Sequence, residues 1–197
     1  MKKVFFGILL AMAGLVSILA VPVQILLMNF VPGAYSASMV FTLVMYFATA
    51  LGYWLIMRGA EELPQTQFWH YAGLFSKILC AYNVAIGLLN FVGDMGLFTL
   101  HLPTLIDNIL YYITDLGSFF IMYFCVLGLR ELQYISRKNL YADKVYKCFT
   151  VWMVVRLLAS LLTGWLYLVS IVAYIVMLVY YGRAAWAYDK RNPYQEY

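Results

Sequence analysis

Residues 148–182 read CFTVWMVVRLLASLLTGWLYLVSIVAYIVMLVYYG, and this stretch decides the fold. Its only charged residue is Arg156. As one helix the stretch would be about 52 Å long, well beyond the ~30 Å of hydrocarbon in a bilayer. Thr163 and Gly164 provide a plausible turn, so the stretch predicts two consecutive membrane-spanning helices. A single long helix is the alternative, and it would leave one span fewer.

The remaining sequence has the same apolar character. Hydrophobic residues make up 65% of the chain, charged residues make up 11%, and the mean hydropathy is +0.82. In a soluble domain about a quarter of the residues are charged. Backbone groups must be hydrogen-bonded within the membrane, and the apolar spacing here is helical. We therefore expect an all-α membrane protein, a compact six-helix transmembrane bundle in which residues 1–197 form one domain. The expected spans lie at about 4–27, 39–58, 71–92, 109–129, 145–163 and 165–183.

The first of these spans has a second interpretation. Lys2 and Lys3 before an apolar run also fit a secretion signal, and Pro22 interrupts the segment. A cleavage site needs small residues, and the Ile-Leu-Ala sequence at 18–20 meets that need poorly. We expect a retained helix that is kinked at Pro22.

The positions of the basic residues predict the orientation in the membrane. With six spans and a cytoplasmic N-terminus, all but two of the 13 Lys and Arg residues fall on the cytoplasmic side, and the expected outer loops hold none. The two exceptions, Lys77 and Arg156, lie within spans. The others are Lys2, Lys3, Arg58, Arg130, Arg137, Lys138, Lys144, Lys147, Arg183, Lys190 and Arg191. Since loops rich in Lys and Arg stay in the cytoplasm, both ends of the chain are expected there, in a multi-pass protein of a cell membrane, the bacterial inner membrane. The net charge of +4 then reflects contact with the lipid bilayer, and no nucleic-acid partner is expected.

Two charged residues in the spans are predicted to meet. Asp115 lies about 9 Å from the outer end of the fourth span, and Arg156 lies about 10 Å from the outer end of the fifth. These spans are consecutive and antiparallel, so the two charges reach the same depth. Because an isolated charge in the membrane is costly, we expect an Asp115–Arg156 ion pair. It either fixes helix orientation or belongs to a ligand or proton site.

Polar and small residues follow one face of several spans. In the third span they are Ser76, Cys80, Asn83, Gly87, Asn90 and Asp94, and in the sixth they are Tyr167, Ser170, Tyr174, Met177, Tyr181 and Tyr188. Spacings of three and four residues place each set on one helix face. Such faces are typical of helix–helix packing. Alternatively, they converge on a polar, Tyr-lined cavity that binds a small molecule.

The second interpretation gives a hypothetical ligand site within the bundle. Its residues would be Asp115, Arg156, Asn83, Asn90, Asp94, Tyr167 and Tyr174. Tyrosines near span ends, among them Tyr180 and Tyr181, are expected to anchor the protein at the membrane interface instead.

Residues for catalysis or for metal binding do not form a recognisable pattern. The topology separates the two histidines, His70 and His101, and Cys80, Cys125 and Cys148 lie in or beside spans. No metal-ligand spacing, catalytic triad or phosphate-binding glycine motif is present in the sequence. We expect no cofactor and no enzymatic activity.

Two functions remain open at this point, and an enzyme acting on lipid is kept only as a remainder. One is binding or transport of a small molecule through the polar bundle interior. In size, span number and cytoplasmic ends the chain is similar to the substrate-capture subunits of energy-coupling-factor importers, although it has Gly7, Ala11, Ala13 and Ser17 in place of their spaced alanines. The other is a non-catalytic assembly, regulatory or immunity subunit that binds another membrane protein. For that function the charged loop from Arg130 to Lys147 is the expected docking surface.

Overall fold

The computed structural model describes residues 1–11, 34–64, 66–96, 104–162 and 165–189. The side chains at 34–38, 104–113, 115, 160–162, 165 and 167 lie outside this description. The described residues are all-helical, with six helices and no strand. These are α1 (Lys2–Ala11), α3 (Ala34–Glu61), α4 (Gln67–Asp94), α5 (Thr104–Ser136), α6 (Ala142–Leu162) and α7 (Trp165–Asp189).

Four of the helices are long and apolar enough to cross a membrane. The qualifying segments are Met39–Glu61, Gln67–Asp94, Leu116–Ser136 and Leu168–Asp189. This confirms a helical membrane protein with several spans. Helix α6 is not among the four; the part of it whose side chains are described, 142–159, contains Asp143, Lys144, Lys147 and Arg156. The first expected span is described only as far as Ala11, so its kink at Pro22 and the signal-peptide alternative lie outside the described residues.

Each helix α3 to α7 overlaps the expected span in its place, and several are longer. The largest difference is in α5, which continues from the expected end near 129 to Ser136. Leu129 and Leu132 are fully buried, so the added turns still contribute apolar contacts. The turn expected at Thr163 and Gly164 lies outside the described residues, but α6 ends at Leu162 and α7 begins at Trp165.

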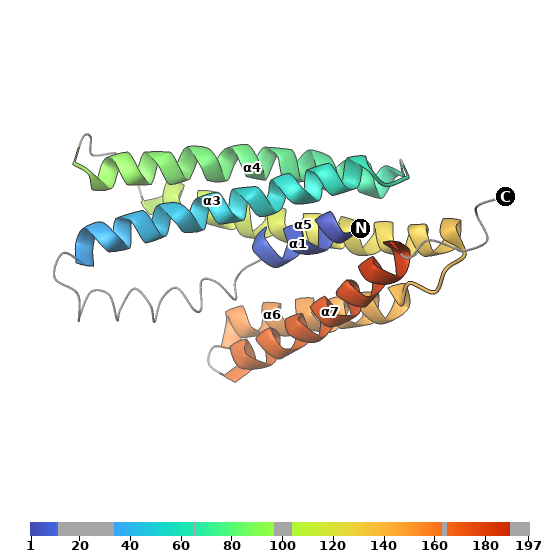
Figure 1. The fold of residues 1–197 in the computed structure, drawn as a ribbon. Coiled ribbons are helices and arrows are strands. Elements are labelled where there is room, and N and C mark those ends of the chain that lie inside the picture. The colour runs from blue at the N-terminus through green and yellow to red at the C-terminus, as the bar shows by residue number, and fades with distance from the viewer. Residues whose placement is uncertain (12–33, 65, 97–103, 163–164, 190–197) are drawn as a thin grey trace.

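The helices are arranged as two antiparallel hairpins joined by α1 and α5 (Figure 1). Helices α3 and α4 pack along their whole length, and α6 packs along α7. Helix α1 lies between the two hairpins and contacts α3, α7 and α5. Helix α5 packs on α4 and continues into α6. The largest fully buried side chains, among them Trp69, Tyr53, Tyr181 and Phe149, come from four different helices, so the core joins both hairpins.

Small residues bring α1 and α3 unusually close together. A Cβ added at Gly52 would lie 2.3 Å from the backbone nitrogen of Ala11, and one added at Gly59 would lie 2.6 Å from Val4 Cγ2. A Cβ at Gly7 would lie 2.6 Å from the Gly52 carbonyl oxygen. Stepping along α1 from Val4 to Ala11 corresponds to stepping back along α3 from Gly59 to Gly52, as antiparallel packing requires. This small-residue seam is the usual means of close helix packing in lipid.

One end of the bundle gathers the chain's described ion pairs, and we call it the basic end. It comprises the start of α1, the connections α3–α4 and α5–α6, and the last turns of α7 (Figure 1). The ion pairs are Met1 amino group–Asp189 (3.7 Å), Lys2–Asp189 (3.6 Å), Lys3–Glu62, Arg58–Glu61 (3.3 Å) and Arg130–Asp143 (3.5 Å). All of them except Arg58–Glu61 join segments from different helices across the basic end. The basic residues therefore lie together in space as well as on one side of the expected topology.

The Lys3–Glu62 pair makes a pH-dependent contribution to stability. The hydrogen bond from Lys3 holds the pKa of the Glu62 carboxyl below its ordinary value. A carboxyl with a lowered folded-state pKa stabilises the protein above its unfolded pKa, and that contribution disappears as the pH falls through the lowered value. Wild type should melt slightly above Glu62→Gln at neutral pH, and the two melting curves in detergent should coincide in acid. A difference that persists in acid would contradict this role.

Candidate functional site at the basic end

Polar side chains on the predicted helix faces form hydrogen bonds between helices. Asn90 donates a hydrogen bond from Nδ2 to the hydroxyl of Tyr46 at 3.2 Å, which links α4 to α3. Tyr53 and Ser118 share a hydrogen bond of 2.5 Å between their hydroxyl oxygens, which links α3 to α5. Tyr174 donates to the carbonyl oxygen of Ile8 at 3.3 Å, which links α7 to α1. These three contacts are of the kind that helix packing requires, whereas the buried hydroxyls of Ser76 and Tyr181, on the same polar faces, have no hydrogen-bond partner among the described residues.

The predicted ligand residues do not form one described cluster. Asn83 is 4% exposed and donates to the Leu79 carbonyl one turn back in its own helix, at 2.8 Å. Asp94 is exposed at the end of α4, away from Asn83. Arg156 is half-buried in α6 and is engaged in an interaction. The side chains of Asp115 and Tyr167 lie outside the described residues, so the Asp115–Arg156 pair stays a prediction.

The tyrosine stripe of α7 forms its buried face. Ser170, Tyr174, Met177 and Tyr181 are all buried, at the spacing of three and four residues read from the sequence. Tyr181 was expected at the membrane interface but is 0% exposed, and that expectation is wrong. Its hydroxyl has no hydrogen-bond partner among the described residues. The ring is buried because position 181 continues the inner face one turn beyond Met177.

A double-mutant cycle tests whether the polar faces hold the helices together. Tyr53→Phe and Ser118→Ala should each destabilise the protein by about 1 kcal/mol, the usual net value of one hydrogen bond. Both changes remove the Tyr53–Ser118 bond, and Ser118→Ala also removes the bond from the Ser118 hydroxyl to the Thr114 carbonyl oxygen at 2.8 Å, so the double variant should lose little more than Ser118→Ala alone. Unfolding in detergent micelles measures the three free energies. Fully additive losses would show that the two hydroxyls act independently.

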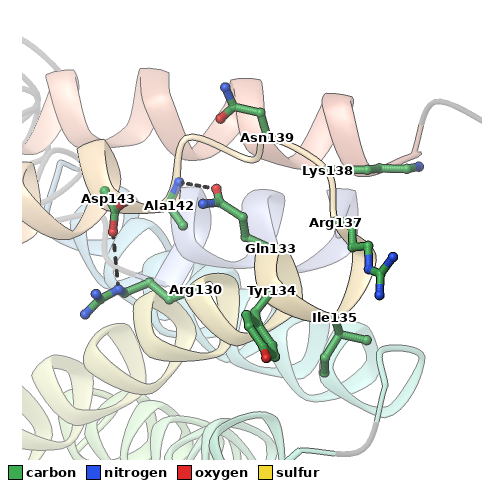
Figure 2. Close-up of a pocket in the computed structure, with 9 residues that line it drawn as sticks. All are labelled: Arg130, Gln133, Tyr134, Ile135, Arg137, Lys138, Asn139, Ala142 and Asp143. Carbon is green, nitrogen blue, oxygen red and sulfur yellow. Dashed lines mark hydrogen bonds and ion pairs between the residues drawn. The ribbon is translucent and has the colours of Figure 1, made fainter.

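A groove of about 1040 Å³ opens at the basic end, where α5 turns into α6 (Figure 2). Its walls are the last turns of α5, the connection to α6 and the first turn of α6. The lining residues are Arg130, Gln133, Tyr134, Ile135, Arg137, Lys138, Asn139, Ala142 and Asp143. All of them belong to the loop region from Arg130 to Lys147 that the sequence singled out as a docking surface.

Gln133 fixes the shape of this groove. Its Oε1 atom accepts hydrogen bonds from the backbone N–H groups of Leu140 (3.0 Å) and Ala142 (3.1 Å), and Figure 2 shows the side chain reaching across to Ala142. Leu140 is fully buried and anchors the centre of the connection. Arg137 and Tyr141, on either side of it, have positive φ angles of 53° and 54°. Non-glycine residues rarely adopt this conformation, so the surrounding contacts hold the connection in one defined turn.

The charges around the groove are only partly neutralised. Arg130 pairs with Asp143 and also lies 4.7 Å from the ring centre of Tyr146. Lys138 donates to the Tyr188 carbonyl oxygen at 3.2 Å, which ties the connection to the end of α7. Within the part of the chain that the structure describes, no carboxylate lies within ion-pair distance of exposed Arg137. The groove therefore presents positive charge to its surroundings.

The described residues do not form a candidate metal site. Among the described residues, no group of three or more His, Cys, Asp or Glu side chains is placed to hold a metal ion. The groove itself contributes Asp143 alone of these types, and that carboxylate is paired with Arg130.

The fold and the site define a class: this is a multi-pass, α-helical membrane protein with a basic groove between two of its helices. No protein-family model matches the chain, and neither curated proteins nor solved structures show a significant similarity to it.

Sequence reasoning identified the loop but missed the residue that organises it. Gln133 is an ordinary polar residue near a helix end, and its partners lie seven and nine positions further along the chain. No local motif predicts that contact. Tyr134 and Ile135 carried a weak signal, since an apolar pair beside arginines outside the expected span is unusual.

Proposed function

We propose that the chain is a six-span, non-catalytic membrane subunit that binds another membrane protein through the groove of its basic end. Both ends of the chain and the α5–α6 connection would then lie in the cytoplasm, in keeping with the distribution of lysine and arginine. Helix α6 would be the fifth span, because Arg156 is its only charged residue beyond the first two turns.

The proposal is supported by the residues that line the groove and by the defined conformation of its turn. Tyr134 is 86% exposed and Ile135 is 51% exposed, and both stand beside Arg137 on the last turn of α5. Tyrosine and arginine are among the residues that contribute most to protein–protein binding energy. The turn is held in place by Gln133, so a partner would not have to order it on binding.

The polar helix faces supply the second support. Three polar side chains form hydrogen bonds with neighbouring helices, those of Tyr53, Tyr174 and Asn90. A bundle that serves as a scaffold requires such bonds between its helices. A ligand site within the bundle would depend on Asp115 and Tyr167, whose side chains lie outside the described residues. Small-molecule binding or transport stays the second proposal.

Site-specific photocrosslinking in native membranes tests the docking surface. A p-benzoylphenylalanine at position 134 should give one discrete crosslinked band. The same residue at position 120, exposed near the middle of the α5 span, is the matched control and should not give that band. Adding Arg137→Glu should reduce the yield at position 134 by about fivefold, the loss expected for one important interface residue.

Three outcomes would contradict the proposed function. One is the absence of a protein crosslink at position 134, and another is the same band at position 120. The third is a band at 134 that is unaffected by reversing the charge at Arg137. Mass spectrometry of a band that meets all criteria would identify the partner.

A further inference from the structure

Two basic residues of different helices converge on one aromatic ring near the basic end. Lys144 of α6 places Nζ 5.7 Å from the ring centre of Tyr180, and Arg183 of α7 places Cζ 5.9 Å from the same centre. Lys144 also lies 5.8 Å from the ring of Tyr141. We call Lys144, Tyr180 and Arg183 the shared-ring cluster. It lies on the α6–α7 hairpin and is separate from the residues that line the groove.

The positive charge of this cluster is not neutralised by the protein residues described. The carboxylates of the basic end include Asp189, Glu62, Glu61 and Asp143, which pair with other basic groups, and Glu131, one of whose oxygens is buried without a hydrogen-bond partner among the described residues. No ion pair within the described ranges includes Lys144 or Arg183, and both side chains are exposed. Two like charges near one ring repel each other, and an anion that reaches both would relieve that repulsion.

The position of the cluster suggests where such an anion comes from. Arg183 lies six residues before the end of α7 at Asp189, about 9 Å along the helix axis. Lys144 lies in the first turn of α6. Val179 and Val176, one and two turns from Arg183 toward the apolar part of α7, are 50% and 41% exposed and would face the surrounding lipid. Charged groups beside exposed apolar residues at the end of a membrane helix lie at head-group level.

We infer that the shared-ring cluster binds the phosphate of an anionic phospholipid head group, with Lys144 and Arg183 on the phosphate oxygens and Tyr180 holding the two basic side chains in place. Arginine is suited to phosphate because its planar fork donates to two oxygens at once, and lysine adds a point charge. The acyl chains would run along the exposed valines of α7. This inference does not depend on the proposed protein partner, since it uses other residues.

Native mass spectrometry of the protein exchanged into vesicles of phosphatidylglycerol and phosphatidylcholine tests this inference. Wild type should retain phosphatidylglycerol preferentially. Lys144→Gln and Arg183→Gln should each lower its occupancy by about fivefold, the effect of one basic residue near an anionic surface. Lys147→Gln, an exposed basic residue on the same helix outside the cluster, is the matched control and should bind as wild type does.

Charge-conserving variants separate lipid binding from folding. Lys144→Arg should keep most of the phosphatidylglycerol preference and Arg183→Lys, which keeps the charge but loses the planar fork, should keep part of it, whereas a defect in folding would affect both. Equal loss in Lys147→Gln would mean general surface attraction and would overturn the inference. Displacement of phosphatidylglycerol by millimolar inorganic phosphate would also overturn it, because the site would then serve a free anion. Unchanged phosphatidylglycerol occupancy in Lys144→Gln and Arg183→Gln would likewise overturn the inference.

Discussion

Replacing Gly52 by alanine should destabilise the bundle by about 2 kcal/mol, the middle of the range for overpacking a filled interface. The new Cβ would lie 2.3 Å from the backbone nitrogen of Ala11 and 2.8 Å from its Cα. Both are backbone atoms, so the clash is relieved only if α1 moves away from α3. Such a movement would also weaken the contacts of Gly7 and Gly59 along the same seam. Equilibrium unfolding in mixed detergent micelles measures the change.

Gly73→Ala is the matched control for this prediction. A Cβ at Gly73 would meet only the Cβ of Ala60, at an ordinary distance of 3.6 Å. Since alanine is a better helix former than glycine, this variant should be as stable as wild type or more stable. If Gly52→Ala were also neutral, the close contact between α1 and α3 would not exist in the membrane.

Replacing Gln133 by leucine should open the α5–α6 connection. The backbone N–H groups of Leu140 and Ala142 would lose their acceptor, and the positive φ angles at Arg137 and Tyr141 would no longer be held. The expected cost is about 2 kcal/mol, which corresponds to roughly thirtyfold faster local hydrogen exchange. Exchange at residues 140 and 142, followed by mass spectrometry, measures this. The partner crosslink at position 134 should fall with it.

The conservative variant Gln133→Glu keeps an acceptor oxygen in the same place and should retain the protection of both amides. Protection that survived in Gln133→Leu would mean that other contacts, such as buried Leu140, hold the turn by themselves. Loss of protection in both variants would instead point to the amide nitrogen of Gln133, for which the structure shows no role in this turn.

The helical membrane fold could be predicted because lipid allows few alternatives. Long apolar segments such as 165–183 must be helical for their backbone groups to be satisfied. The buried face of α7 was also readable, since Ser170, Tyr174 and Met177 recur at helical spacing. Helix ends were less predictable, because α3 and α5 continue past the apolar core into the interface, where charged and apolar residues are both tolerated.

The candidate site was only partly predictable from the sequence. The charge of the Arg130–Lys147 loop was evident, but its groove depends on Gln133 reaching residues beyond the turn. The shared-ring cluster joins residues nearly forty positions apart, so only the pairing of α6 with α7 brings them together. The sequence also indicates the close contact of α3 with another helix, because Gly52 and Gly59, two glycines seven residues apart in an apolar segment, are typical of such a contact.

Both proposed binding surfaces lie at the basic end, which we propose is the cytoplasmic face of the protein. Labelling of single cysteines with a membrane-impermeant maleimide tests this orientation most directly, in a variant lacking Cys80, Cys125 and Cys148. Suitable exposed positions are Pro64 and Asn139 at the basic end and Met95 at the opposite end of α4. We predict that intact cells label only the cysteine at 95, and that those at 64 and 139 react after permeabilisation. Labelling of 64 or 139 from outside, or protection of 95, would contradict the account.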